Sequence, residues 1–283
     1  MNVVLILARM TFRQAVRKKI VLTGLVLGVC FLVIFSLGFH LISAATDKVT
    51  IPGGKGFIGI INTERSSALL LAGLYTVTFL AIAMAALLGA DALAGEINSG
   101  IIQTIVTKPI RRSDVVLGKW LGFAGLLLLY FLLLAGGTSL SVFLQSGYAA
   151  PHLAAGLALI YLESLLVMTI ALLCSSRFSA LATGGVVFGL YGMAFIGGWV
   201  EQFGSVIQNQ TAINVGIVTS LIVPTEALWH RAAYEMQTPL AGALGLSPFG
   251  TVSVPSLLMI AYALVYLVVV VAWTVRVFQK RDL

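Results

Sequence analysis

Long apolar runs separated by short polar passages dominate this chain, and their lengths predict its architecture. A helix needs roughly 20 apolar residues to cross the hydrocarbon core of a bilayer. Several runs reach that length, so the pattern predicts an all-α membrane protein with six transmembrane helices in a single domain, residues 1–283. The predicted spans cover residues 20–43, 66–90, 119–144, 153–175, 178–200 and 257–275.

Composition supports a polytopic membrane protein over a soluble domain. Hydrophobic residues make up 59% of the chain and charged residues only 10%, and the mean hydropathy is +1.05. A single water-soluble core would not need so much apolar surface. The two cysteines, Cys30 and Cys174, lie in or at the end of apolar runs, so no disulfide framework is implied.

The positions of the basic residues predict the orientation. All 17 lysines and arginines except Lys48, Lys55, Arg65 and Arg231 fall on one side if both termini are cytoplasmic. This placement also argues against a nucleic-acid partner, although the formal net charge is +7. We therefore expect a multi-pass protein of the cell (inner) membrane with its N- and C-termini in the cytoplasm.

Residues 1–19 are expected to form a cytoplasmic amphipathic helix. Arg9, Arg13 and Arg17 recur at i, i+4 and i+8, which places them on one stripe. A basic stripe of this kind binds anionic lipid headgroups at about 1 kcal/mol per residue. These three arginines are the predicted contact with the lipid bilayer.

The passage between the fifth and sixth spans, residues 201–256, is expected to be extracytoplasmic. Its apolar stretch, residues 211–223, covers only about two-thirds of a spanning length and stops before Pro224. The pattern therefore predicts short re-entrant or interfacial helices before the last span. We expect Trp229 and Tyr234 to lie at the membrane interface.

The passage between the second and third spans, residues 93–113, carries the most specific pattern. On a helical wheel its isoleucines and Val106 share one side, opposite Glu96 and several Ser, Gln and Thr residues, so a short amphipathic helix is predicted. Pro109 ends that helix, and Ser113 or Asp114 is expected to cap the next one. Alone, such a helix could equally lie on the bilayer surface. Because its polar face carries no Lys or Arg, we favour docking to a protein.

Catalytic motifs are missing from the sequence. The GGKG at residues 53–56 lacks the upstream glycine and following Ser or Thr of a phosphate-binding loop. The three histidines show no metalloprotease spacing, and no Gly-x-Ser-x-Gly occurs. We therefore expect no catalytic residue, no metal and no cofactor in this chain; if it works on ATP, another chain must bind it.

The spacing of Glu96, Gly100, Pro109, Arg112 and the pair Gly118-Lys119 closely resembles that of ABC-2 type transporter permeases, with Ile101 where that family usually has Thr. The resemblance extends over essentially the whole chain. It implies the membrane half of an ATP-driven transporter, in which residues 93–113 form the coupling helix that seats in a separate ABC ATPase subunit. The residues implied in coupling are Glu96, Ile97, Gly100, Ile101, Ile105, Lys108, Pro109, Arg111, Arg112, Gly118 and Lys119.

The resemblance also implies partners and a direction. Two permease chains, here a homodimer, assemble with two ATPase subunits that hold ATP and magnesium, and an exporter is the favoured reading. The family resemblance adds ATPase contact to the roles of the N-terminal arginines. In the fifth span it favours Gly185, Gly189 and Gly192 as a dimer contact.

Glu163 is the main charge predicted within a span. It either lines the translocation path or forms a structural hydrogen bond with a Ser or Tyr of a neighbouring helix. A secondary transporter or channel, or a membrane scaffold that transports nothing, remains the alternative function. Ion-coupled transporters usually show several such charges or internal repeats, and neither is evident here.

Overall fold

The computed structural model describes residues 3–46, 55–98, 111–244, 249 and 254–280, and these residues are almost entirely helical. The helices are α1 (Val3–Val16), α2 (Lys19–Thr46), α3 (Lys55–Asn98), α5 (Arg112–Ser146), α6 (Leu153–Ser175), α7 (Ala180–Val206), α8 (Gln210–Ile222), α9 (Thr225–Met236), α10 (Pro239–Leu244) and α11 (Leu257–Gln279).

Six of these helices are long and apolar enough to cross a bilayer: α2, α3, α5, α6, α7 and α11. The short helices α8 and α9 are joined at a break with a bend of 107°. Pro224 occupies this break and cannot donate the backbone hydrogen bond that a continuous helix requires. The predicted all-α membrane fold, with six spans and short helices before the last one, is therefore confirmed.

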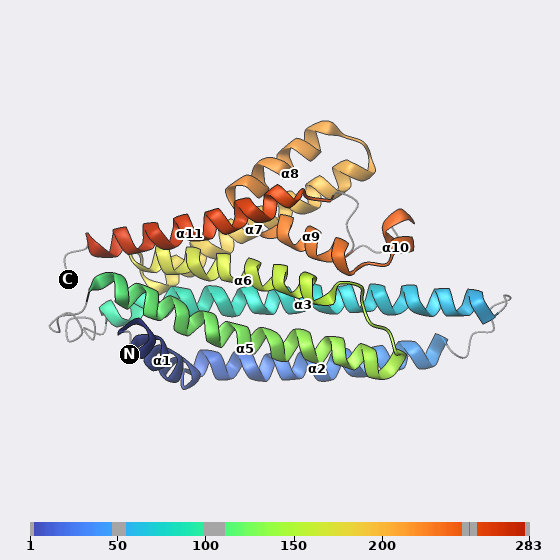
Figure 1. Cartoon of the computed structure of the whole chain (residues 1–283), viewed down its shortest axis with the longest axis horizontal. Helices are drawn as coiled ribbons and strands as arrows, with labels where there is room; N and C mark the ends of the chain where they lie inside the picture. Colours follow the sequence, from blue (N-terminus) through green and yellow to red (C-terminus); the bar gives the residue numbers. More distant parts are fainter. Residues whose placement is uncertain (1–2, 47–54, 99–110, 245–248, 250–253, 281–283) are drawn as a thin grey trace.

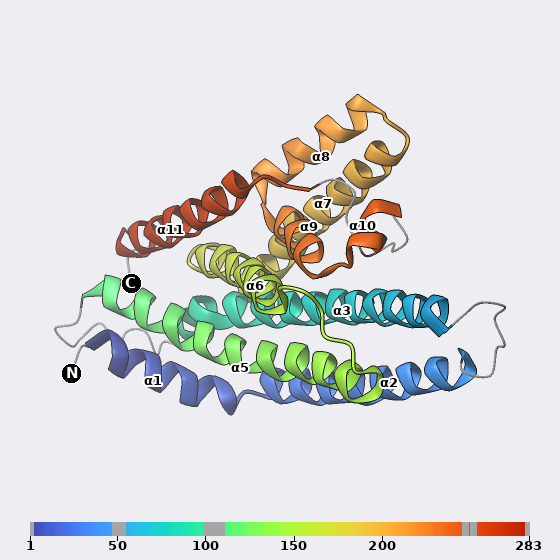
Figure 2. The ribbon, with the colours of Figure 1, turned by 45° about the vertical axis from the view of Figure 1, so that its right-hand side comes forward.

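Helix α6 lies at the centre of the bundle (Figures 1 and 2). It packs on α3 and α5 on one side, and on α7, α9 and α11 on the other. Helices α1 and α2 pack along α5. In the apolar window of each span, 61% of α6 is buried, against 11% of α2 and 17% of α11. Helices α2 and α11 therefore present most of their surface to lipid or to a partner chain.

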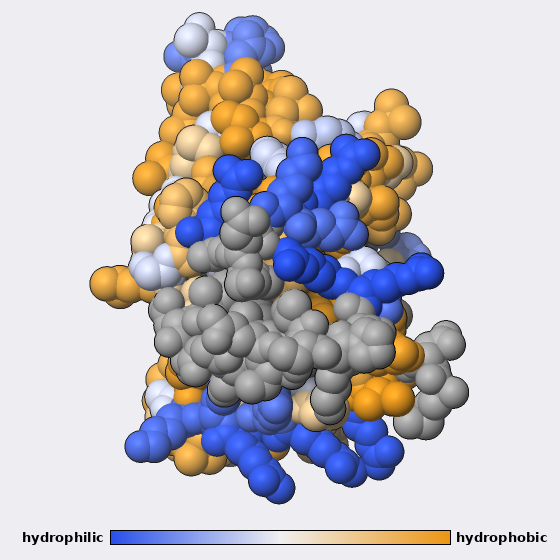
Figure 3. Space-filling view, turned by 90° about the vertical axis from the view of Figure 1, so that its left-hand side faces the viewer, coloured by the Kyte–Doolittle hydropathy of each residue, from blue (hydrophilic) through white to orange (hydrophobic). Residues whose placement is uncertain are grey.

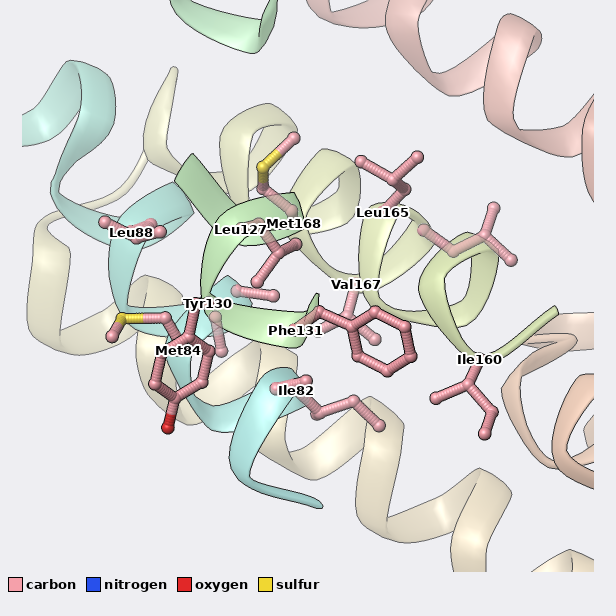
Figure 4. Close-up of a cluster of buried hydrophobic side chains, with 14 of the residues drawn as sticks. Ile82, Met84, Leu88, Leu127, Tyr130, Phe131, Ile160, Leu165, Val167 and Met168 are labelled. Carbon is pink, nitrogen blue, oxygen red and sulfur yellow. The ribbon is translucent and has the colours of Figure 1, made fainter. Parts of the chain in front are cut away.

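Most of the core consists of apolar side chains from α3, α5 and α6, part of which Figure 4 shows. Helix α5 contributes Phe131, which is fully buried, and Tyr130, whose hydroxyl donates to the Gly24 carbonyl of α2 at 3.2 Å. The polar tip of Tyr130 thus ties the core to the exposed helix α2. The other labelled members are Ile82, Met84 and Leu88 of α3, Leu127 of α5, and Ile160, Leu165, Val167 and Met168 of α6.

Helix α3 is much longer than its predicted span of residues 66–90. Its 44 residues extend over about 66 Å, roughly twice the hydrocarbon thickness. Polar residues beyond each end of the apolar run end the membrane-spanning part of α3, but the helix continues through them. A helix makes its backbone hydrogen bonds internally, so it is stable in water as well as in lipid. The first residues of the predicted coupling segment, up to Asn98, therefore continue α3.

Two local predictions are wrong. The N-cap of α5 is Arg111, with no side-chain cap, so neither Ser113 nor Asp114 caps this helix; Asp114 lies in its first turn. Trp229 does not lie at an interface: it is 3% exposed and packs in the core, whereas Tyr234 is 45% exposed. The helix α9 turns its tryptophan toward Tyr75 of α3, with ring centroids 4.8 Å apart.

The amphipathic helix α1 crosses α5 at two glycines. A Cβ built on Gly118 would lie 2.5 Å from Leu7 Cβ, and one built on Gly122 would lie 2.7 Å from the Ala8 carbonyl oxygen. These close approaches require the absence of side chains, as in other membrane helix pairs with small residues at the crossing. Thr11 and Ala15 are the other buried residues of α1.

Replacing Gly122 tests this crossing. Gly122→Ala should destabilise the protein by about 1–3 kcal/mol, because the new methyl group meets backbone that cannot rotate away. The midpoint of unfolding in a sodium dodecyl sulfate titration measures the loss. Gly136→Ala on the same helix is the matched control, since a Cβ there meets nothing within 4 Å. Equal midpoints for the two variants would contradict the crossing.

Candidate functional site

The end of the bundle that carries both termini is also where α3 ends and α5 begins (Figure 1). Hydrophilic side chains gather on this face, and hydrophobic ones cover its flanks (Figure 3). We call it the basic end. Among the described residues, its exposed basic side chains are Arg9, Arg13, Arg17, Lys19, Arg111, Arg177, Arg276 and Lys280.

The predicted coupling segment lies at the basic end, between α3 and α5. Glu96 and Ile97 fall in the last turn of α3, and Arg111, Arg112, Gly118 and Lys119 lie at the start of α5. Gly100, Ile101, Ile105, Lys108 and Pro109 lie outside the described residues. The amphipathic coupling helix and its stiff exit therefore stay predictions.

Two lysines bind the end of α3 to its neighbours. Lys18, just before α2, places Nζ 2.5 Å from Asp91 Oδ2. Lys119 of α5 is only 5% exposed, and its Nζ donates to the Ala92 carbonyl oxygen at 2.7 Å. A Cβ on Gly95 would collide with the Asp91 carboxylate, so this glycine leaves Asp91 room to reach Lys18. The last turns of α3 are thus held from both sides.

The two arginines at the start of α5 differ in their contacts. Arg112 Nη1 donates to the Gln279 carbonyl oxygen at 3.2 Å, which joins α5 to the C-terminal helix α11. Arg111 is exposed, and no ion pair or hydrogen bond of its side chain occurs within the described ranges. The nearby carboxylate of Asp91 is paired with Lys18.

The three arginines of α1 all project away from its contact with α5. Arg9, Arg13 and Arg17 are exposed, and the apolar side chains Leu5 and Met10 are exposed beside them. An exposed face that combines guanidinium groups with apolar side chains suits the boundary between headgroups and acyl chains. The arrangement leaves the stripe accessible to lipid or to a protein partner.

Two acidic side chains are buried deep in the bundle, where burial of an ionised group is costly. Glu163 of α6 is 0% exposed, and neither of its carboxyl oxygens has a hydrogen-bond partner among the described residues. Glu226 of α9 is 2% exposed and lies against Gly198 of α7, where a Cβ would approach its side chain to 2.9 Å. The structural hydrogen bond considered for Glu163 is therefore not formed in the described structure.

Aromatic rings surround the Glu226 side of this buried region. Tyr75 lies at their centre: its ring is 5.5 Å from that of Phe249, and its hydroxyl accepts a hydrogen bond from Trp199 Nε1 at 3.0 Å. Together with Glu226 and His230 these rings line a cavity of about 10 Å³, which is the space of about one water molecule. No substrate of ordinary size fits there in this conformation.

Comparison with known proteins identifies the family. The family model described as ABC-2 family transporter protein matches residues 5–283, nearly the whole chain. The chain belongs to the ABC-2 family of transporter proteins. A search of curated proteins found no match. Family membership, with six apolar helices, makes this chain a multi-pass membrane component of a transporter. Such components are not themselves catalytic and associate with an ABC ATPase and the lipid bilayer.

In this ABC-2 family chain the glycines of α7 fall into two groups. Gly197, Gly198 and Gly204 pack against α8 and α9. No neighbouring side chain or helix lies within 4 Å of a Cβ built on Gly185, Gly189 or Gly192, so the predicted dimer glycines face outward. The described chain leaves that strip of α7 open.

Sequence reasoning missed Glu226, His230 and the Lys18–Asp91 pair. Glu226 and His230 are four residues apart on α9, and the spacing of their side chains is visible in the sequence as one helical face. Their burial is not visible there, because α9 is short and polar enough on average to resemble a surface helix. Only its packing on α6 places these residues inside.

Glu163→Gln tests whether the buried acid stabilises the fold. Because neither carboxyl oxygen is hydrogen-bonded, this substitution should leave the free energy of unfolding within about 1 kcal/mol of the wild type or raise it. The matched control on the same helix is Thr169→Val. It removes the 2.9 Å hydrogen bond from Trp120 Nε1 and should cost about 1 kcal/mol or more. A larger loss in Glu163→Gln than in the control, measured by denaturant titration, would show a structural hydrogen bond.

Proposed function

We propose that this chain is the permease of an ATP-driven exporter, which couples ATP hydrolysis on a separate ABC ATPase to the movement of a substrate across the membrane. Two permease chains and two ATPase subunits form the working unit. ATP and magnesium bind the ATPase, since the sequence offers no phosphate-binding loop of its own. In this proposal both termini and the basic end face the cytoplasm.

One observation carries this proposal: the segment expected to contact the ATPase joins two core helices at the basic end. Helix α3 enters residues 93–113 from one side and α5 leaves them on the other. Lys119 bonds these two helices to each other, and Lys18 bonds α3 to the start of α2. A partner that displaces this segment therefore displaces α3, α5 and α2 together.

The helices are suited to transmit such a displacement as a rigid-body movement. Helix α3 is continuous over 44 residues, so movement at its basic end reaches its opposite end. Its main partner in the core is α6, which carries Glu163. We infer that a shift of α3 against α6 opens the closed region around Glu163 and Glu226, and that Glu163 then lines the translocation path. The cavity of about 10 Å³ beside Glu226 corresponds to a closed conformation of that path.

The exposed Arg111 provides a test of ATPase docking. Affinity-tagged full-length chain is purified from its native host, and the co-purifying proteins are identified by mass spectrometry; an ABC ATPase is expected in equal amounts. Arg111→Glu should weaken this association about tenfold or more, because it reverses a charge that has no intramolecular partner in the described structure.

Arg177→Glu is the control for Arg111→Glu. It makes the same charge change at an exposed arginine of the basic end, on the turn between α6 and α7 and outside the coupling segment. If both variants retain the ATPase equally, or if no ATPase co-purifies with the wild type, the docking proposal fails. A transport activity driven by a proton gradient in liposomes that lack the ATPase would instead favour a secondary transporter.

The outward glycines of α7 provide a test of the homodimer. Gly189→Leu should shift the purified protein from dimer to monomer, because a branched side chain separates helices that approach through glycine. It should leave the unfolding midpoint unchanged, since a Cβ at this position meets no neighbour within its own chain. Mass measurement by light scattering in detergent reads the oligomeric state, with Gly136→Leu on α5 as the control. A dimer that survives Gly189→Leu would place the contact elsewhere.

A further inference from the structure

A polar cavity of about 470 Å³ lies at the end of the bundle opposite the termini. There α2 ends, α3 begins and α5 ends (Figure 1). Neither the coupling segment nor the buried acids contribute to it. Polar side chains dominate its wall, among them Ser43, Asn62, Thr63, Arg65, Ser66 and Gln145.

Arg65 is a cation in this wall, and no ion pair joins it to a carboxylate among the described residues. Its Nη2 donates to Ser43 Oγ at 3.4 Å, while Nε and Nη1 are buried with no hydrogen-bond partner in the described chain. The adjacent Glu64 is turned elsewhere and accepts a hydrogen bond from Thr238 at 2.6 Å. A partly buried guanidinium without a paired anion is costly, and an anion in the cavity that Arg65 lines would balance its charge.

A second, mostly apolar groove of about 650 Å³ adjoins this cavity between α2 and α5. Gln145 lines both spaces. Its Nε2 donates to Ser36 Oγ at 3.2 Å and to Ser141 Oγ at 3.0 Å, while its Oε1 is left without a partner among described residues. The groove runs along the apolar parts of both helices, and its walls are formed mainly by Val29, Leu32, Val33, Leu37, Leu140 and Leu144.

We propose that the cavity and the groove together bind one anionic phospholipid, with its phosphate beside Arg65 and an acyl chain along α2 and α5. Guanidinium matches phosphate in charge and in its paired donor geometry. The position fits as well, because the polar cavity lies where the helices end and the apolar groove lies along their spans. Free phosphate would use the cavity alone and a zwitterionic lipid would bring its own cation to Arg65. An anionic lipid supplies both an unpaired negative charge for the cavity and an acyl chain for the groove.

The test uses the full-length chain, purified and stripped of lipid in a neutral detergent. Phosphatidylglycerol, phosphatidylcholine and inorganic phosphate are added separately, and native mass spectrometry counts the bound molecules. Wild type should retain phosphatidylglycerol at least about fivefold better than phosphatidylcholine. Arg65→Gln should abolish this preference, and Arg177→Gln, at an exposed arginine of the basic end, should preserve it. Leu140→Trp should fill the groove and weaken retention of both lipids.

A second variant, Asn62→Asp, tests the proposal independently in case Arg65→Gln fails to fold. It places a negative charge in the cavity wall while it leaves the bond between Arg65 and Ser43 in place, and it should also abolish the preference. The proposal is overturned if wild type binds both lipids equally, or if Asn62→Asp keeps the preference. Inorganic phosphate that binds as tightly as phosphatidylglycerol would assign the cavity to a free anion. Dimerisation that displaces the lipid from wild type would assign the groove to a second copy of the chain.

Discussion

The cost of placing charge in hydrocarbon determines where most of the described Lys, Arg, Asp and Glu side chains lie, and the rest of the structure depends on it. Spans are nearly free of charge, so their helices pack through apolar side chains and small residues. The charged groups are displaced to the helix ends. Those that remain partly or fully buried are therefore informative, because each needs a compensating partner: Lys119 has a carbonyl oxygen and Asp91 has Lys18. In the described structure Glu163 has no such partner, and Arg65 has only the hydroxyl of Ser43. Both residues belong to proposed functions.

Apolar run length predicted the number and order of the spanning helices, because a bilayer admits few other structures. It could not predict the length of α3, since the helix outlasts its apolar run at both ends. Ser and Asp commonly cap helices, which made Ser113 or Asp114 the expected N-cap, but the N-cap of α5 is Arg111, two or three residues earlier. Trp229 was misplaced for a different reason. An aromatic residue in a short polar helix looks interfacial until the packing of α9 on α6 is known.

The candidate site was predicted in outline and not in its contacts. The motif spacing located the segment between α3 and α5, yet it gave no sign that Gly118 faces α1 or that Lys119 is buried. The family resemblance implied a role for both residues in coupling. In the structure they hold α1 and α3 to α5, so their place in the motif has a structural reason that is compatible with coupling. The same motif residues can thus serve both helix packing and contact with a partner.

The two proposed ligand contacts lie at opposite ends of the same pair of helices. The ATPase segment joins α3 to α5 at the basic end, and the lipid cavity is built from the start of α3 and the end of α5. If the shift of α3 against α6 changes the cavity around Arg65, the lipid must bind one conformation better than the other. By linkage, the factor by which the bound lipid changes the affinity of the ATPase for the basic end equals the factor by which the ATPase changes the affinity for the lipid. Continuity of α3 over 44 residues gives this coupling a direct physical path, because no hinge within the helix interrupts it.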